Sequence, residues 1–562
     1  MPFLDWLAQV NDAINGVVWG WPMIILMLGT GIYLTVRTKF LQVRKFHTSW
    51  GATIIPTFKS IGKKPSLPTG IKRENSVSPF EAFATAISGT VGTGNIVGVT
   101  SAIMTGGPGA VFWMWISAFF GMVTNYAENV LGMYFRKKDK SGEFCGGPAY
   151  YLSEGLGQMG KGKSKSFFKW LGKILAVMAA VFCVFAAIGM SGVQTNKISD
   201  SVKNVFPGVD STLMGVIVGV VVAAVLALVI IGGIKSIGRV ASILVPFMSL
   251  IFIVMAFIII FSNVTVVGGA FALIFGNIFS FGAVAGGVSG YLFAQVIQKG
   301  LARGIFSNEA GLGSSVIAHS ASATREPVRQ GLWGIFEVFF DTFIICTLTA
   351  LVVLVCFGNE TGMQEVLYKG AYNAKGEWEF AYADTQVSAM AFGSIFGGAG
   401  NVGTILYTIM LPLFAFTTIL AWSYYGEKSV EFLFSKAGDK AKKIAKLVFK
   451  IAYVLLVIAA ALMSSDLLWD ISDTFNGLMA LPNLIGLVFL GGLVAKLTKN
   501  YFDRKKGKNV EPMLSAYPDQ NEEFKADLQA EGAEENAAEV APSQSAEEDV
   551  ETAKEENSDS EE

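Results

Sequence analysis

Long apolar segments recur along almost the whole chain and decide what it can fold into. About eleven of them reach the roughly 20 residues that a helix needs to cross a bilayer, and 52% of all residues are hydrophobic while 15% are charged. Inside a bilayer, only helices and closed barrels satisfy their own backbone groups. The sequence therefore predicts an all-α polytopic membrane protein. The predicted spans cover approximately residues 16–36, 79–104, 108–135, 168–195, 212–234, 240–262, 279–302, 328–357, 400–425, 445–464 and 470–498.

The charges between these spans predict the orientation of the chain. Lys and Arg gather in residues 37–73 and again in alternate loops further along, whereas the long loop 358–386 is acidic. Basic loops tend to stay on the cytoplasmic side of a membrane. We therefore expect a multi-pass protein of the cell (plasma or inner) membrane, with its N-terminus outside and its C-terminus in the cytoplasm.

The last part of the chain has a different composition from the rest. Residues 511–562 carry 18 acidic and 2 basic side chains and few large apolar ones. Such a segment cannot bury enough apolar surface to fold, so we expect residues 510–562 to be a disordered acidic cytoplasmic tail. The other predicted divisions are an extra N-terminal helix with a basic cytoplasmic loop (1–78) and two groups of five spans (79–262 and 263–509).

Glycine and threonine interrupt the span 79–104 within the run Ser88-Gly89-Thr90-Val91-Gly92-Thr93-Gly94-Asn95-Ile96-Val97-Gly98. Glycines weaken a helix, and the backbone groups that this frees must face protein or a polar cavity. The N-terminus of a half-helix favours an anion, and free carbonyl groups favour a small cation. This pattern predicts a central transport site, although small residues also allow plain close packing of helices.

A second glycine-rich run interrupts the span 279–302, between Gly282 and Gly290. The two interruptions fall in the first and sixth of the ten spans that follow the N-terminal one. Broken helices at matching positions are typical of transporters built from inverted repeats, with the substrate between the halves. The sequence thus favours a ten-helix core of two inverted five-helix repeats with broken first and sixth helices; chance placement among 62 glycines is the alternative.

Polar residues inside other spans are further candidates. Thr417 and Thr418 follow Phe414, and Trp422 lies one turn beyond. Adjacent hydroxyls and a carbonyl suit a hard monovalent cation, but threonines in membrane helices often bond their own backbone instead. Gln194 can contact a polar solute or bond another helix.

Ionisable residues inside spans mark functional candidates. Glu337 and Asp341 are spaced i, i+4 and share a helix face, so they form either a proton or cation relay or a structural pair with a neighbouring helix. Glu128 is expected near the cytoplasmic end of its helix, reaching water or Arg136. Both histidines fall in predicted cytoplasmic loops, so no histidine relay is predicted; they are His47 and His319.

The sequence offers no signature of an enzyme or a primary pump. It contains no phosphate-binding G-x-x-x-x-G-K-[ST] run and no soluble segment large enough for an ATPase domain, and its 4 cysteines lack metal-ligand spacing. Neither a channel-like filter nor a ring of acidic residues is evident. We expect no catalytic residues and no nucleic-acid partner.

Three runs resemble the alanine or glycine:cation symporter family. They are GGPGAVFWMWISAFFG at 106–121, GGPAYYL at 146–152 and RGIFSNEAGLGS at 303–314. The resemblance extends over almost everything except the tail. It implies a sodium-coupled importer of a small neutral amino acid, alanine or glycine, acting as a monomer by alternating access. It also implies the leucine-transporter-type fold of ten core helices in two inverted halves, with one extra helix at the N-terminus.

The resemblance also implies two sets of site residues. The amides of Thr93 and Gly94 would receive the substrate carboxylate, and the rest of the substrate site would comprise Asn95, Gln194, Gly287, Gly290 and Trp422. A site for the coupling sodium ion would use the carbonyls of Ser88, Val91 and Phe414 and the hydroxyls of Thr417 and Thr418. In some relatives the residue matching Asn95 holds a second sodium ion, but the seventh core helix here offers no asparagine as its partner.

Two alternatives stay open at this stage. A proton-coupled carrier of the same fold would transport without sodium and would depend on Glu337 or Asp341. A sodium-coupled carrier of glutamine or serine would use the same fold for another substrate.

Overall fold

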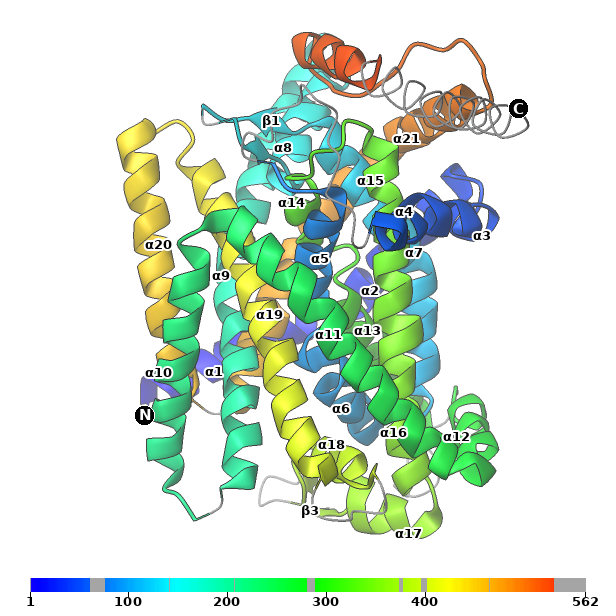
Figure 1. The fold of residues 1–562 in the computed structure, drawn as a ribbon, viewed down its shortest axis with the longest axis vertical. Coiled ribbons are helices and arrows are strands. Elements are labelled where there is room, and N and C mark those ends of the chain that lie inside the picture. Colours follow the sequence, from blue (N-terminus) through cyan, green and yellow to red (C-terminus); the bar gives the residue numbers. More distant parts are fainter. Residues whose placement is uncertain are drawn as a thin grey trace, which may run out of the picture.

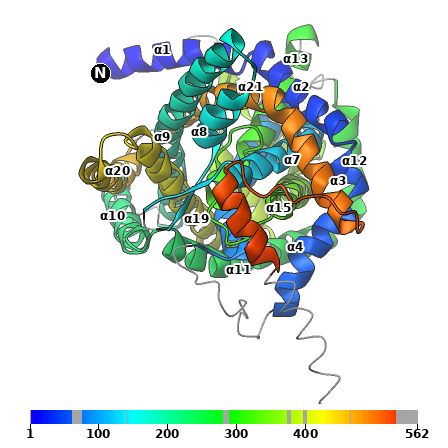
Figure 2. The same cartoon turned by 90° about the horizontal axis from the view of Figure 1, so that it is seen from above.

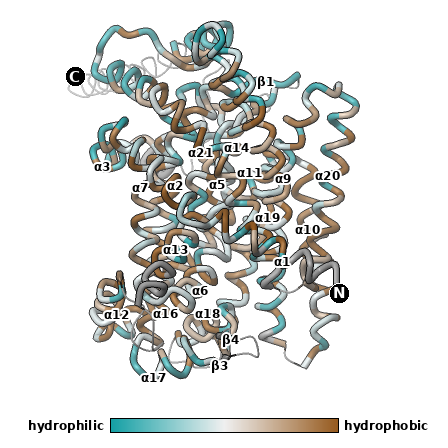
Figure 3. The backbone as a smooth tube through the Cα atoms, turned by 180° about the vertical axis from the view of Figure 1, so that it is seen from behind, coloured by the Kyte–Doolittle hydropathy of each residue, from teal (hydrophilic) through white to brown (hydrophobic). Residues whose placement is uncertain are grey.

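The computed structural model describes residues 2–60, 76–140, 142–206, 208–279, 289–372, 378–395, 402–463 and 465–529, and helices dominate this part of the chain (Figure 1). Hydrophobic residues colour the middle of the helices, while hydrophilic residues gather at the two ends of the molecule (Figure 3). This distribution is the one that a membrane-spanning bundle requires.

The N-terminal helices run around part of the outside of the bundle, as Figure 2 shows in blue. They are α1 (Pro2–Val18), α2 (Trp21–Arg37), α3 (Leu41–Arg44) and α4 (Phe46–Ser60). The next group comprises α5 (Pro79–Thr90), the short 3₁₀ turn η1 (Thr93–Asn95), α6 (Val97–Gly106), α7 (Ala110–Tyr134), α9 (Lys163–Val205), α10 (Ser211–Ile230) and α11 (Gly233–Ser262). Between α7 and α9 lie the antiparallel pair β1 (Lys137–Lys138) and β2 (Phe144–Cys145), then α8 (Pro148–Tyr150), η2 (Tyr151–Gly155) and η3 (Leu156–Gln158).

The second half of the chain contains the remaining helices. They are α12 (Val264–Gly276), α13 (Ser289–Asn308), α14 (Ser315–His319), α15 (Pro327–Val338), the π-helix η5 (Phe339–Cys346), α16 (Thr347–Phe357), α18 (Asp384–Gly393), α19 (Val402–Leu433), α20 (Asp439–Ala460) and α21 (Ser465–Lys505). The connection from α16 to α18 holds α17 (Glu360–Gly362), η6 (Met363–Leu367) and the antiparallel pair β3 (Gly370–Tyr372) and β4 (Trp378–Phe380).

The prediction of an all-α polytopic membrane protein is confirmed. Within the described residues, 8 helices are long and apolar enough to cross a membrane, and two shorter apolar helices accompany them. The number of eleven spans and the inverted-repeat layout stay predictions, because the span 79–104 is divided between α5 and α6 and residues 280–288 lie outside the described part. The predicted span 470–498 lies within α21, which runs on through Pro482.

The helix α5 has a well-defined start and is buried along most of its length. Ser78 Oγ accepts from the Glu81 amide and Glu81 Oε2 accepts from the Ser78 amide, which forms a capping box ahead of Pro79. Every residue from Ala82 to Thr90 is buried, and α5 packs against α11, α14 and α19. This helix therefore lies inside the bundle rather than at its lipid-facing surface.

The strand-like residue before α5 is tied to the segment after α14. The Val77 amide donates to the Ala321 carbonyl over 3.2 Å, and the Ala323 amide donates to the Val77 carbonyl over 2.7 Å. These two bonds connect the beginning of α5 to the end of α14 by backbone groups alone.

The expectation of a disordered tail from residue 510 is wrong for its first part. Residues 511–529 cross one end of the bundle and contain a helix at 518–529, orange to red at the top of Figure 1. Leu514 and Phe524 are fully buried together with Phe144, and Arg325 Nε donates to Asp527 Oδ2 over 2.6 Å. Two apolar anchors and an ion pair hold this acidic segment. Residues 530–562 lie outside the described part.

Candidate substrate and cation site

The first helix break lies where the glycine and threonine pattern predicts it. Helix α5 ends at Thr90, Gly92 is extended with φ −135° and ψ −151°, and α6 begins at Val97. Asn95 Oδ1 accepts from the Gly92 amide over 2.9 Å. This side chain therefore joins the two ends of the segment between α5 and α6. Gly92 is required by close approach, because a Cβ there would collide with the Thr418 hydroxyl.

The predicted cation ligands come from the end of α5 and from α19. Thr418 Oγ1, on α19, lies 3.0 Å from the Ser88 carbonyl oxygen and 3.1 Å from the Phe414 carbonyl oxygen. Thr417 Oγ1 lies 3.0 Å from the same Phe414 oxygen. Four of the five predicted groups therefore meet in one buried place, and Val91 lies fully buried just after the end of α5.

The predicted carboxylate-binding amide at Thr93 already has a partner within the protein. Its N–H donates to Gln194 Oε1, on α9, over 3.1 Å. Thr93 Oγ1 is buried and has no hydrogen-bond partner among the described residues. The structure thus brings Gln194 to the break. It also places there the Thr93 hydroxyl, which forms no hydrogen bond with any described residue.

A second break lies at residues 309–314, between α13 and α14. Three residues of this segment adopt positive φ: Glu309 at 54°, Gly311 at 96° and Gly313 at 76°. The sequence analysis placed the second interruption at Gly282–Gly290 instead. Gly287 lies outside the described residues, and Gly290 lies in the first turn of α13, about 24 Å along the helix from Phe306. Gly290 therefore does not join the site in this structure.

Residues around the second break close over the first one. The Phe306 ring lies against Gly94, since a Cβ on that glycine would stand 3.2 Å from Phe306 Cδ1. Trp422 Nε1 donates to Glu309 Oε1 over 2.9 Å. Sequence reasoning chose Trp422 but missed Phe306 and Glu309, although both stand in the run RGIFSNEAGLGS, whose glycine spacing could have indicated a break.

A buried carboxylate joins the two breaks. Asn95 Nδ2 donates to Asp341 Oδ1 over 2.6 Å, and the hydroxyls of Ser307 and Thr342 donate to Asp341 Oδ2 over 2.7 and 2.8 Å. Asp341 belongs to the π-helix η5, and such bulges often occur at functional sites. The partner of Asn95 is therefore a carboxylate on η5, in the span 328–357 where the sequence analysis searched for an asparagine.

Glu337 and Asp341 have different hydrogen-bond partners in the structure. Glu337 Oε2 lies 2.8 Å from His319 Nε2, and His319 Nδ1 lies 2.7 Å from Gln330 Nε2. The expectation that His319 belongs to a solvent-facing loop is wrong, because it is fully buried on α14. The π-helix, which begins at Phe339, separates the two carboxylates that a regular helix would place on one face.

The expectation for Glu128 is also wrong. It is fully buried and reaches neither water nor Arg136; its Oε1 accepts from the Gly311 amide over 3.1 Å. Arg136 instead donates to the carbonyls of Ser320, Ser322 and Thr324. Arg136 lies just beyond the end of α7, about 12 Å along the helix from Glu128, and so does not pair with it.

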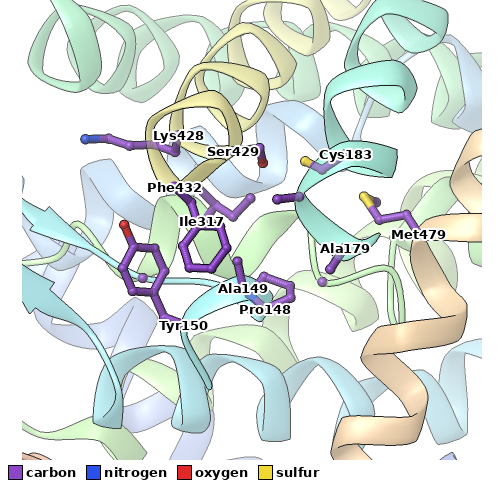
Figure 4. A pocket seen from close by; sticks show the side chains of 13 residues that line it. Pro148, Ala149, Tyr150, Ala179, Cys183, Ile317, Lys428, Ser429, Phe432 and Met479 are labelled. Carbon is purple, nitrogen blue, oxygen red and sulfur yellow. The ribbon is translucent and has the colours of Figure 1, made fainter. Parts of the chain in front are cut away.

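A cavity lies next to the second break, at the end of the molecule that carries residues 511–529 (Figure 4). Its lining is mostly apolar and comes from α8, α9, α14 and α19, with Gly313 on one side and the Lys428 ammonium at its edge. The Lys428 charge is balanced by Glu143 and Glu431, at 2.9 and 3.0 Å. The cavity therefore extends from the second break toward one end of the bundle.

The structure combines two interrupted helices, a buried set of oxygen ligands and an enclosed polar site within an all-helical membrane bundle. Together these features define a secondary transporter. The sequence comparisons agree with this class. The family model described as the sodium:alanine symporter family matches residues 4–515. The chain belongs to this family, and it is a cation-coupled amino-acid transporter rather than an enzyme.

Three relatives illustrate the range of names within the family. The sodium/alanine symporter AgcS of Methanococcus maripaludis is 40% identical over 506 residues, which cover 90% of this chain and 99% of that protein. The probable sodium/glutamine symporter GlnT of Bacillus subtilis is 34% identical, covering 89% of this chain and 92% of its own. The putative sodium/proton-dependent alanine carrier protein YrbD of the same organism is 34% identical, covering 90% and 95%.

Proposed function

We propose that this protein imports a small neutral amino acid, alanine or glycine, together with sodium by alternating access. The observation that carries the proposal is the Thr418 hydroxyl, which lies 3.0 Å from the Ser88 carbonyl oxygen and 3.1 Å from the Phe414 carbonyl oxygen. These oxygens come from two helices that are far apart in the sequence. A hard monovalent cation that binds among them would connect α5 to α19 at the first break.

The cation would act by fixing the shape of the broken helix. Ser88 and Val91 lie in its last turn and just beyond, so a cation held by their carbonyls and by the Thr417 and Thr418 hydroxyls would order the residues that follow. The amides of Thr93 and Gly94 would then be presented to a substrate carboxylate. Because coupling between two sites is reciprocal, the substrate should increase sodium affinity by the same factor.

Gln194 would change partners when substrate binds. Its Oε1 now accepts from the Thr93 amide, and a carboxylate that takes over this amide would release the Gln194 carbonyl to accept from the substrate ammonium group. The free Thr93 hydroxyl would supply a further bond, and Asn95 would keep the break in register. Phe306 and Trp422 would limit the side chain to a small one. We propose that the monomer performs this cycle with its N-terminus outside.

Uptake of labelled alanine into proteoliposomes tests the proposal. Sodium is replaced by choline at fixed pH, for the wild type and for the double variant Thr417→Ala with Thr418→Ala. We expect uptake to need sodium and to fall about tenfold or more in the double variant, because two buried oxygen ligands are lost. Thr418→Ser keeps the hydroxyl and should retain uptake. Thr408→Val removes a half-buried hydroxyl from the same helix that bonds only its own backbone in the structure, and serves as the matched control.

Two outcomes would contradict parts of this proposal. Uptake that needs no sodium would contradict sodium coupling and favour a proton-coupled carrier. Uptake of glutamine or serine without uptake of alanine or glycine would retain the coupling and contradict the substrate.

Proton coupling is the second candidate function, and Asp341 is the observation that favours it. Asn95, Ser307 and Thr342 surround this buried carboxylate, and all three contribute uncharged donors. A carboxylate without a cationic partner can alternate between charged and protonated forms during a transport cycle. This candidate predicts that uptake follows a pH gradient and is lost in Asp341→Asn.

A further inference from the structure

The second break requires an unusual backbone. Glu309, Gly311 and Gly313 all adopt positive φ within five residues, and a side-chain-bearing residue in that region is strained. Such a conformation persists only when the surroundings hold it in place. The residues that hold it therefore influence the shape of the proposed substrate site. That site includes Phe306, near the end of α13, and Glu309, just after α13 ends.

Side chains from two helices bind the two backbone groups of Gly311, in the middle of the second break. Glu128 Oε1, on α7, accepts from the Gly311 amide over 3.1 Å. Asn483 Nδ2, on α21, donates to the Gly311 carbonyl over 2.8 Å and to Glu128 Oε1 over 2.5 Å. Tyr151 in turn donates to Asn483 Oδ1. Both backbone groups of Gly311 are thereby satisfied by side chains rather than by helix bonds.

The position of Asn483 depends on the sequence around it. Pro482 precedes it within α21, and a proline inside a helix removes one backbone bond and bends the helix. Asn483 is fully buried, and its side chain packs against Gly313, where a Cβ would stand 3.1 Å from Asn483 Cγ. The same side chain therefore contacts two of the three positive-φ residues of the break.

We propose that Glu128 and Asn483 are positioning residues for transport: together they fix the second break so that Phe306 and Glu309 close over the first break. This proposal rests on the proposed function for its substrate. Neither side chain needs to contact the amino acid or the cation. Glu128 Oε1 accepts both from the Gly311 amide and from Asn483 Nδ2, so this one oxygen joins the break to α21.

The test separates a positioning role from a purely structural one. Glu128→Ala removes the acceptor of the Gly311 amide, whereas Glu128→Gln keeps a carbonyl oxygen for it. We expect Glu128→Ala to raise the half-saturating alanine concentration about tenfold or more, while the sodium requirement is retained. Glu128→Gln should restore it to within about threefold. Asn483→Ala should resemble Glu128→Ala, since it removes the bond to the Gly311 carbonyl.

The matched control is Tyr126→Phe. Tyr126 is fully buried on the same helix, and its hydroxyl bonds Thr498 on α21 over 2.7 Å. This bond joins the same two helices without touching the break. If packing between α7 and α21 were the relevant quantity, Tyr126→Phe would raise the half-saturating concentration as Glu128→Ala does, and the proposal would be overturned.

Two further results bear on the proposal. Equal losses in Glu128→Gln and Glu128→Ala would overturn it in favour of a role for the negative charge itself. A fall in maximal rate alone, at unchanged half-saturation, would also overturn it, with folded protein measured by size-exclusion chromatography to correct for yield. Failure of the wild type to take up alanine would instead contradict the proposed substrate, and the same comparison would then be made by binding of the amino acid that it does transport.

Discussion

The Asn95 amide nitrogen lies 2.6 Å from Asp341 Oδ1, and this contact links the first helix break to the π-helical turn of η5. The other oxygen of Asp341 accepts from Ser307, two residues before the second break. A single carboxylate therefore contacts residues next to both interruptions. Any change in its charge or shape affects the two breaks together.

Substitution of Asp341 should discriminate between the two coupling ions. Asp341→Ala leaves the Asn95, Ser307 and Thr342 donors without their buried acceptor, at a cost of about 1–3 kcal/mol for each unsatisfied group, so we expect uptake to be lost. Asp341→Asn keeps one acceptor oxygen but cannot take up a proton in the same way. Under sodium symport, Asp341→Asn retains measurable sodium-dependent uptake. Under proton coupling it abolishes uptake driven by a pH gradient, and transport measured across a pH series reports which occurs.

Gly92→Ala should weaken sodium binding. The added methyl group meets the Thr418 hydroxyl, so the Ser88, Phe414 and Thr418 oxygens cannot keep their spacing. We expect the half-saturating sodium concentration to rise about tenfold or more, which corresponds to about 1.4 kcal/mol. Gly98→Ala is the control, because the space beside Gly98 is open. Equal effects of the two substitutions would show that flexibility of the segment, rather than the Thr418 contact, is what glycine provides.

Trp422 should set the size limit for the substrate. Trp422→Ala removes a fully buried indole and its bond to Glu309, so we expect larger neutral amino acids to compete with labelled alanine more effectively. Trp422→Phe loses the indole N–H but keeps most of the bulk. Its selectivity should stay close to the wild type, while its affinity falls by about fivefold to tenfold for one lost hydrogen bond. Unchanged selectivity in Trp422→Ala would contradict the assigned role.

Residues 511–529 should contribute to the stability of the folded protein. Phe524 is fully buried against Phe144, and the Arg325 guanidinium lies 4.9 Å from the Phe524 ring centroid. Phe524→Ala should lower the free energy of unfolding by about 3 kcal/mol, as for other buried aromatic residues, and thermal unfolding in detergent measures this. Truncation after Gln529 keeps all of these contacts and should leave the unfolding temperature unchanged. A chain truncated after Val510 should behave like Phe524→Ala or worse.

The sequence predicted the class of fold and the first break because both depend on local composition. Four glycines within eleven residues of an apolar span weaken any helix, and the partners of that break on α19 could be named from the family resemblance. The interruption expected at Gly282–Gly290 stays a prediction, because residues 280–288 lie outside the described part. The break at residues 309–314 was not predicted, and its Gly311 is held by contacts with α7 and α21 that no local pattern records. The partners of Asp341, His319 and Glu128 escaped prediction because most of them are distant in sequence.

The tail shows the opposite limitation. An average over residues 511–562 is strongly acidic, and this average concealed Leu514 and Phe524, whose burial is enough to hold the nearby residues against the bundle. Composition describes a segment as a whole, whereas two well-placed apolar side chains decide how residues 511–529 pack.

The backbone bonds between Val77 and residues 321 and 323 impose a mechanical condition on transport. A motion that tilts the beginning of α5 away from the bundle must either carry the end of α14 with it or break two peptide hydrogen bonds at once. Helix α5, which precedes the first break, and helix α14, which follows the second break, are thus linked and move together. Since both bonds use only peptide groups, the link between α5 and α14 transmits a displacement of the backbone directly and does not depend on a side-chain rotamer.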